Sequence, residues 1–255
     1  MKRRYYIILA IISYLIFALA STPAAKVISL AQNNFNLPVK FYGVQGSIWN
    51  GQADSLLAQN HRIDQLKWSL NPAALLLASI SADIQASIKE QNIIGHISVN
   101  MNGDIEAKDL RATLSAKDVQ QLAAMPFGEL DGKFVLNIES LSWPGNGIPD
   151  TTGTIKWHQA KLTLVEAVDL GQVIINIKPD DNDGMLIEIE NKGGALSING
   201  SIALSDKKQY RLQLDFNPAS NANANIKQSL AMFAKRQSNG SYRFKQNGNL
   251  NQLGL

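Results

Sequence analysis

The sequence predicts a mainly β protein: a long antiparallel meander or curved sheet with a few short helices, preceded by one N-terminal transmembrane helix. Three observations predict this fold class. The N-terminus carries a charge-free apolar stretch, most of the remaining chain alternates apolar and polar residues, and segments rich in Gly and Asn separate the alternating runs. Alternation with period two is typical of an antiparallel sheet with one face in water.

The N-terminal stretch predicts the topology of the chain. It opens with three basic residues, Lys2, Arg3 and Arg4, and then carries no charge over residues 5–25. A helix of that length extends about 30 Å, enough to cross the hydrocarbon core of a bilayer. The positive-inside rule predicts a cytoplasmic tail at 1–4, a transmembrane helix at 5–25 and a single periplasmic β-rich domain at 26–255.

A cleavable signal peptide is the alternative for the same stretch. Ala18-Leu19-Ala20 fits the small-x-small pattern that precedes a cleavage site, and the apolar core before it has a suitable length. Both interpretations export the main domain, and the residues alone leave the choice between them open.

After Lys26 the alternation identifies individual strands. Alternating runs occupy residues 83–89, 96–101, 133–139, 173–178, 185–190 and 210–216. Segments with turn residues lie at 102–104, 130–133, 143–150, 178–185 and 198–201.

Helices are expected at few places. Short ones are predicted near 26–35, 72–78 and 117–124. Residues 225–236 have a clearer apolar helical face, made by Ile226, Leu230, Phe233 and Ala234, with Lys235 and Arg236 at the end of the helix.

Charge and cysteine content exclude several classes of protein. The net charge is +3, and without the three N-terminal basic residues 21 Lys and Arg stand against 21 Asp and Glu. A nucleic-acid partner is therefore not expected, because such binders concentrate basic residues on one face. The chain has no cysteine, which excludes disulfides and thiolate chemistry.

No arrangement of residues predicts catalysis or a cofactor. His61, His96 and His158 have no metal-ligand spacing and are expected to be solvated surface residues. Around Gly184 the acidic residues resemble a calcium loop, but Pro179 stands where the first carboxylate is required, so an acidic hairpin tip is expected instead. We expect a protein that is not an enzyme and holds no cofactor or metal.

The glycine-rich segment at residues 41–56 raises the question of a phosphate-binding loop. Gly43, Gly46 and Gly51 are not followed by Gly-Lys-Ser/Thr and do not open a helix, so a Walker loop is excluded. Ile48 and Trp49 are expected to pack within a turn-rich pair of strands.

This segment and the one after it resemble the type II secretion system protein N family. The first motif, Gly-x-Φ-Trp-x-Gly-x-Ala, is carried by Gly46, Ile48, Trp49, Gly51 and Ala53, and the second, Trp-x-Leu-x-Pro-x-x-Leu-Leu, by Trp68, Leu70, Pro72, Leu75 and Leu76. The stretches at 125–143 and 239–250 resemble the middle and tail of the family, although Ala78-Ser79 replaces an expected glycine.

The resemblance implies a function and a location. It implies a single-pass protein of the bacterial inner membrane, with a periplasmic domain, that assists the export of folded periplasmic proteins across the outer membrane through contacts with other secretion components. The motif residues would then be structural or interaction residues. A more distant architectural likeness to AsmA and TamB proteins implies an alternative, a lipid-binding or lipid-transfer module of the envelope.

Overall fold

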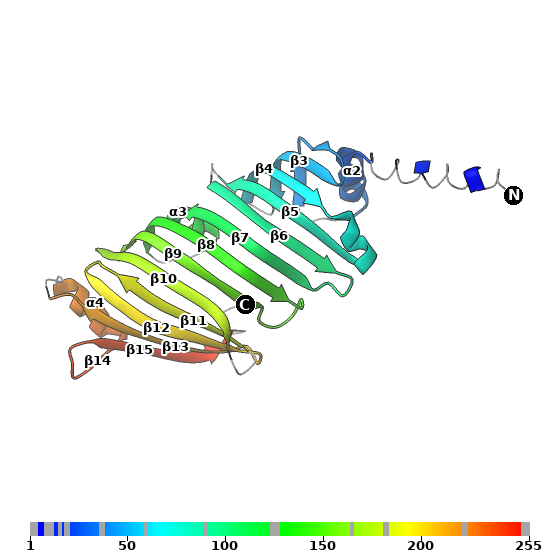
Figure 1. Ribbon diagram of the computed structural model, residues 1–255. Coiled ribbons are helices and arrows are strands. Elements are labelled where there is room, and N and C mark those ends of the chain that lie inside the picture. Colours follow the sequence, from blue (N-terminus) through cyan, green and yellow to red (C-terminus); the bar gives the residue numbers. More distant parts are fainter. Residues whose placement is uncertain are drawn as a thin grey trace. The chain divides into compact units, whose positions relative to one another are not determined.

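The computed structural model describes residues 5–7, 13–14, 17, 21–35, 39–58, 61–88, 91–122, 128–163, 166–180, 184–220 and 224–250. The chain divides into two compact units, Met1–Ser98 and Val99–Leu255 (Figure 1). The predicted transmembrane helix lies largely outside the described residues. Within them, no helix is both long enough and apolar enough to span a membrane.

The first unit contains a sheet that follows the helix α2 (Ala24–Asn34). After it come β1 (Val39–Tyr42), β2 (Gln45–Gly46), β3 (Asn50–Ala58), β4 (His61–Leu70), the 3-10 helix η1 (Pro72–Leu77), β5 (Ser79–Ile88) and β6 (Gln91–Asn100), within which the division between units falls. Neighbours follow the order β1-β3-β4-β5-β6, and β2 pairs with β3. The pairs β1–β3, β2–β3, β3–β4 and β4–β5 are antiparallel.

The second unit is a longer meander. Its strands are β7 (Ile105–Ser115), β8 (Glu129–Trp143), β9 (Asp150–Thr163), β10 (Ala167–Asp180), β11 (Gly184–Lys192), β12 (Leu196–Ser205), β13 (Gln209–Pro218), β14 (Lys235–Arg236) and β15 (Tyr242–Asn249). They lie in chain order except at the end, where β15 pairs with β13 and β14 with β15. Two helices, α3 (Ala116–Leu122) and α4 (Ala224–Phe233), interrupt the strands.

Aliphatic side chains form continuous rows across the second sheet. Residues paired directly across antiparallel strands point to the same face. One row runs through Ala112, Leu136, Ile155, Ile175, Ile189, Gly200, Leu214 and Phe244. A second row runs through Leu110, Ile138, Gly153, Ile177, Ile187, Ile202 and Leu212. The alternation in the sequence thus becomes one apolar face.

The two helices cover part of this apolar face. The buried cluster combines sheet residues such as Phe134, Trp157 and Phe216 with Ala116 of α3 and Leu230 of α4. Phe134 stacks on Trp157 with the ring centroids 5.0 Å apart. The covered region is therefore the core of this unit, and most of the two aliphatic rows beside it is only half-buried.

The predicted mainly β, antiparallel fold with few short helices is confirmed within each unit. Helices occur near all four predicted places, at α2, η1, α3 and α4. The predicted end of this last helix is wrong. Lys235 and Arg236 are not helical but form β14, which pairs with β15. Met101, predicted at the end of a strand, lies in the turn after β6 and is exposed.

Two of the predicted turns are also wrong, since their glycines lie inside strands. Gly132 has φ +107° at a bulge of β8, and a Cβ there would collide with backbone oxygens of His158 and Gln159. Gly200 lies within β12, where a Cβ would collide with Leu214. Both glycines mark close approach to the neighbouring strand rather than reversal of the chain. The turn before β12 uses Gly193 and Gly194, both at positive φ.

Candidate functional site

The two motifs predicted from the sequence meet in the first unit. Gly51 of β3 is paired directly with Trp68 of β4. A Cβ at residue 51 would overlap the Trp68 indole ring, so the glycine leaves the space that the ring fills. The indole Nε1–H donates a hydrogen bond to the Ile48 carbonyl at 3.0 Å. We call residues 46–53 and 68–72 the motif junction.

The junction also holds the chain that leaves the N-terminal stretch. The Ile48 amide donates to the Thr22 carbonyl at 3.0 Å, and Pro23 forms an isolated β-bridge with Ser47. On the other side, the Leu70 amide donates to the Trp49 carbonyl at 2.6 Å. Ile48 and Trp49 are half-buried, as expected for packing in a turn-rich pair of strands. The junction therefore ties residues 22–23 to the end of β4.

The remaining motif residues build the connection to η1. Ala53 is buried in β3, opposite Leu66. Asn71 is the N-cap of η1, because its side chain accepts a hydrogen bond from the Ala73 amide, and Pro72 occupies the first position of that helix. Proline suits this position since its missing N–H would have no partner there.

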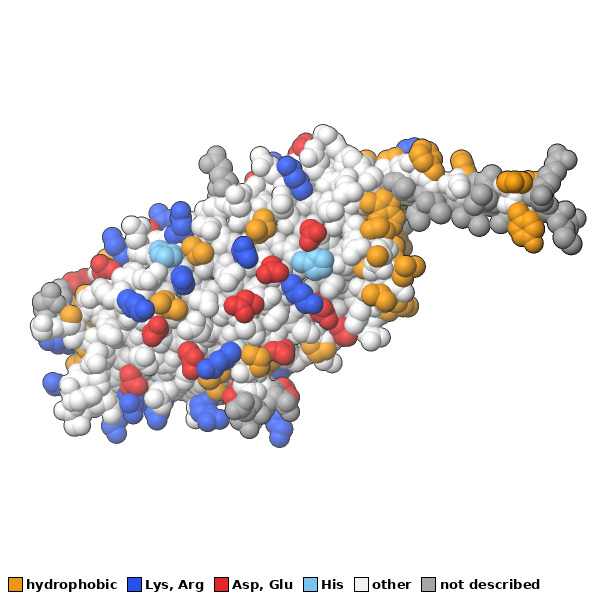
Figure 2. All heavy atoms as spheres, in the orientation of Figure 1, with side chains coloured by type: hydrophobic (Ala, Val, Ile, Leu, Met, Phe, Trp, Pro, Cys, Tyr) orange, Lys and Arg blue, Asp and Glu red, His pale blue; other side chains and the backbone are white. Residues whose placement is uncertain are grey.

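The helix η1 presents its large side chains to solvent. Leu75, Leu76 and Leu77 are 49%, 88% and 82% exposed, and Ile80 of β5 is 58% exposed. The residue of η1 that is buried is the small Ala74. Figure 2 shows apolar side chains gathered on the surface of this unit. We call Leu75, Leu76, Leu77 and Ile80 the leucine patch.

Part of the middle of the family pattern packs into the core of the second unit. Trp157 donates its indole N–H to the Asp131 carbonyl at 2.9 Å, next to the Gly132 bulge, and its ring stacks on Phe134. Packing within the unit is therefore enough to account for Asp131, Gly132 and Phe134.

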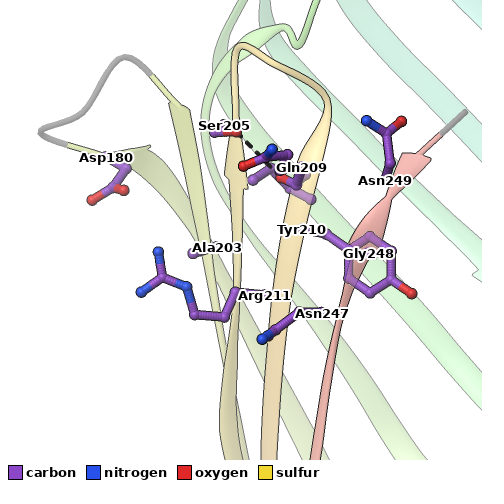
Figure 3. A pocket seen from close by; sticks show the side chains of 10 residues that line it. Asp180, Ala203, Ser205, Gln209, Tyr210, Arg211, Asn247, Gly248 and Asn249 are labelled. Atoms are coloured by element: carbon purple, nitrogen blue, oxygen red, sulfur yellow. Dashed lines mark hydrogen bonds between the residues drawn. The ribbon is translucent and has the colours of Figure 1, made fainter.

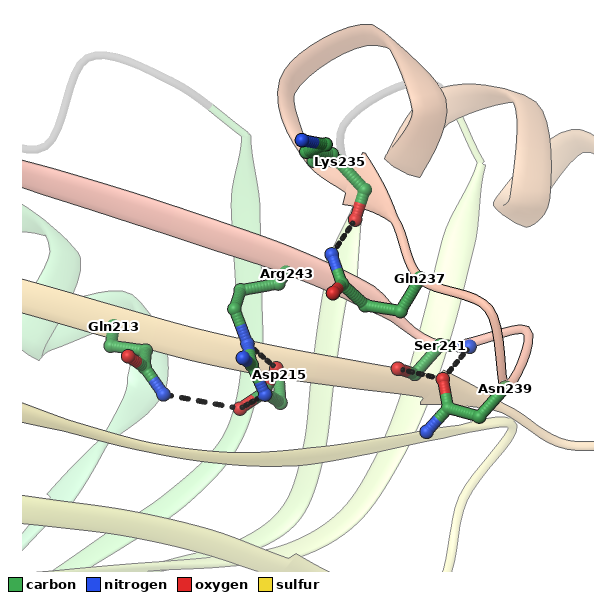
Figure 4. Close-up of polar contacts among 7 residues, drawn as sticks. All are labelled: Gln213, Asp215, Lys235, Gln237, Asn239, Ser241 and Arg243. Carbon is green, nitrogen blue, oxygen red and sulfur yellow. Dashed lines mark hydrogen bonds and ion pairs between the residues drawn. The ribbon is translucent and has the colours of Figure 1, made fainter.

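The tail of the family pattern is also explained by the fold. Tyr242 is buried, and Phe244 packs edge-to-face on Phe233 of α4. Arg243 binds the Asp215 carboxylate with two nitrogens, at 2.6 and 3.2 Å (Figure 4). The hydrogen bond and then the charge of Asp215 raise the pKa of Arg243. The side chain of Asn239 closes the loop before β15 by accepting from the amide and hydroxyl of Ser241.

Ser81, His96 and Asp83 form a contact that the sequence did not suggest. The Ser81 hydroxyl lies 2.8 Å from His96 Nε2, and His96 Nδ1 lies 2.8 Å from an Asp83 oxygen. If Nδ1–H of the neutral ring donates to Asp83, Nε2 accepts a hydrogen bond from the Ser81 hydroxyl. This is the connectivity of a serine-hydrolase triad. Ser81 is only 7% exposed, however, so its hydroxyl offers little access to a substrate. A polar network between β5 and β6 accounts for the arrangement.

The expected surface histidines are partly exposed, and they also have polar partners. His96 belongs to this network, and His158 has its Nδ1 3.1 Å from Gln172 Nε2. The side chain of His61 lies outside the described residues. These partners lie on neighbouring strands, so spacing along the chain does not reveal them.

Two of the pockets in the second unit differ in character. One, of about 860 Å³, is lined mainly by polar residues of β12, β13 and β15, with the Tyr210 ring against Gly248 (Figure 3). The other, of about 340 Å³, lies beneath α4 and is lined by apolar side chains that include Val168, Ile198 and Phe216. The smaller pocket has the apolar lining typical of small-molecule sites.

The suggested calcium loop is only partly described. Asp181 and Asp183 lie outside the described residues, and Glu190 belongs to β11. Within the described part of the chain, no group of three His, Cys, Asp or Glu side chains could hold a metal ion. The basic residues Lys2, Arg3 and Arg4 lie outside the described residues as well.

The matches with known proteins all point to one family. The sequence model described as "Type II secretion system (T2SS), protein N" matches residues 38–245. The chain is 24% identical to "Type II secretion system protein N" of Vibrio cholerae serotype O1, over 82% of this chain and 84% of that protein. It is also 24% identical to "Type II secretion system protein N" of Aeromonas hydrophila, over 95% of this chain and 96% of that protein. No solved structure matches.

The contact between Gly51 and Trp68 predicts a non-additive mutant pair. Gly51→Ala should lower the free energy of unfolding by about 1–3 kcal/mol, because the new methyl overlaps the indole. In Gly51→Ala/Trp68→Ala the ring is gone, so the combined loss should be smaller than the sum of the single losses. Urea unfolding followed by circular dichroism measures all three, with the exposed neighbour Gln52→Ala as control. Additive losses would mean that the glycine serves another purpose.

The limited access to Ser81 predicts that the triad-like contact is unreactive. A fluorophosphonate probe should not label the folded chain, since it must reach a serine oxygen to react. Gel fluorescence and mass spectrometry of the labelled protein measure this. Labelling that disappears in Ser81→Ala and persists in Ser79→Ala would instead identify a catalytic serine.

Proposed function

Because this chain belongs to the type II secretion system protein N family, we propose that it is an accessory component of type II secretion, held in the inner membrane by its N-terminal stretch. One observation carries the proposal: the family model matches residues 38–245, a range that contains both motifs of the junction, and the two relatives are similar over at least 82% of this chain. Its work is contact with other secretion components in the periplasm, without catalysis and without a cofactor.

One edge of the described strands suits protein contact. On the side of β15 that faces β14, Tyr242 and Arg243 pair with β14, and no strand pairing on that side is described for residues 244–248. An extended partner segment can add to such an edge through main-chain hydrogen bonds. The opposite end of the strand order is the short strand β1, which offers fewer groups. We therefore expect a partner strand to add at β15.

Deletion of the gene in its own host tests the secretion role. We expect secreted enzymes to accumulate in the periplasm of the deletion strain, with release restored by a plasmid copy of the full chain. Enzyme activity in the culture medium and in the periplasmic fraction measures the effect. The matched control is a cytoplasmic marker, which must stay inside the cell in every strain. Unchanged release, together with failure to co-purify any secretion component, would refute the proposal.

The N-terminal stretch is proposed to stay attached as the membrane anchor, with residues 1–4 in the cytoplasm and residues 26–255 in the periplasm. Its uncharged length and the basic residues before it support this orientation. The rival interpretation, cleavage after Ala20, falls in a part of the chain outside the described residues.

Cell fractionation distinguishes retention from cleavage. We expect the full-length chain in the membrane fraction, resistant to alkaline carbonate extraction, with the N-terminal residues still present by mass spectrometry. Protease added to spheroplasts should digest the main domain, because it faces outward. A soluble periplasmic species that begins at Ser21 would refute the anchor and would leave the exported domain.

Lipid binding is the second candidate function, and the apolar pocket beneath α4 is the observation that favours it. Most of the aliphatic rows beside it is half-buried, so an acyl chain could extend along the sheet. Native mass spectrometry after mild extraction tests this candidate. A bound lipid should be lost in Val168→Trp, which fills the pocket, and kept in the exposed control Gln85→Trp. Absence of lipid from the unmodified chain would exclude the role.

A further inference from the structure

The leucine patch is an exposed apolar surface that the fold itself does not use. Three leucines and one isoleucine fall within six residues, and each is about half exposed or more. Single exposed aliphatic residues are common on protein surfaces, but a contiguous group marks a contact surface. No charged residue lies between Ser69 and Ala82, so the surroundings of the patch in the sequence are uncharged too.

The conformation of the patch is fixed from both ends. Asn71 caps the start of η1 with its side chain, and its amide donates to the Ser81 carbonyl at 2.8 Å. Ala78 closes the helix in the left-handed region with φ 55°. The small Ala74 is the residue of η1 that faces the protein. The leucines therefore face outward because of the helical turn itself.

We propose that the leucine patch inserts into the outer leaflet of the inner membrane and forms a second membrane contact beside the N-terminal anchor. This proposal rests on the anchoring given under the proposed function. Its support is the motif junction, where the Thr22 carbonyl accepts from the Ile48 amide and the Trp49 carbonyl accepts from the Leu70 amide. Thr22, near the end of the uncharged stretch at 5–25, is thereby linked through Ile48 and Trp49 to β4, the strand that leads into η1.

The distances along this path are short. From Leu70 to the middle of the patch the chain advances about 12 Å at the 3-10 rise per residue. An interfacial helix buries its apolar face about 5–10 Å into the boundary between headgroups and acyl chains. A membrane that receives the N-terminal stretch is therefore within reach of the leucines.

The composition of the patch favours lipid over a protein partner. Protein interfaces are enriched in aromatic residues, Met and Arg at their centre. The patch contains only aliphatic side chains, which gain from contact with acyl chains without requiring a matching surface. Lipid is accordingly the occupant to which the patch is assigned.

Fluorescence quenching in proteoliposomes tests the proposal on the full chain. Because the chain has no cysteine, Leu76→Cys gives a single site for the dye NBD. The matched control is Gln85→Cys, at an exposed position of β5 in the same unit. Both variants are reconstituted in vesicles of phosphatidylethanolamine and phosphatidylglycerol that contain a lipid with a nitroxide on the acyl chain near the headgroup.

The expected result is a blue-shifted emission at position 76 that the nitroxide lipid quenches, with neither effect at position 85. Unquenched emission at position 76 would overturn the proposal, and so would a disulfide between two copies that forms at position 76 in place of quenching. Co-sedimentation with the vesicles reports the anchor separately. A chain that sediments without quenching at position 76 loses the patch contact but keeps the anchoring.

Discussion

The structure depends on one constraint, which is that each sheet must shield an apolar face while its strands stay in antiparallel register. In the second unit the register places aliphatic residues of neighbouring strands directly opposite one another, in rows across the sheet. Neighbouring side chains within a row therefore shield part of one another's surface from water. Gly153 and Gly200 occur where a side chain in the row would collide with Ile138 or Leu214. Among the described residues the short helices α3 and α4 add cover, and an apolar pocket opens beneath α4.

The same constraint acts differently in the first unit. There the absence of a side chain at Gly51 leaves the space that the large Trp68 ring fills. This fit brings the Ile48 carbonyl within reach of the indole N–H and so fixes the turn between β2 and β3. The turn in turn holds Thr22 and Leu70. A change at the glycine would therefore act on three segments that are distant in the sequence.

The sequence was informative wherever a local pattern decides the structure. Alternation predicted strands such as β5, β10 and β13, and the apolar face of residues 226–234 predicted α4. The failures involve contacts between distant residues. Gly132 and Gly200 have the local appearance of turn residues, and only the adjacent strand shows that they fill close approaches. Likewise His96 shows no partner in its own neighbourhood, because Ser81 and Asp83 reach it across the sheet. The motifs of the candidate site were found by spacing, but the pairing of Gly51 with Trp68 required the register.

The motif residues fall into two groups: those that pack within the junction and those whose side chains point to solvent. Gly51, Ala53 and Trp68 are satisfied inside the unit by packing or hydrogen bonds, so a structural role explains them fully. Leu75 and Leu76 belong to the same stretch of sequence, yet they contribute little to the core. A 3-10 helix that buried its leucines and exposed its alanines would give more apolar burial at no cost in length. The observed helix buries Ala74 and exposes Ala73 as well as the leucines, so it forgoes that stabilisation. The side chains that the junction orients outward are therefore the part of the motif that folding alone does not explain, and they are the part that a contact outside the chain does explain.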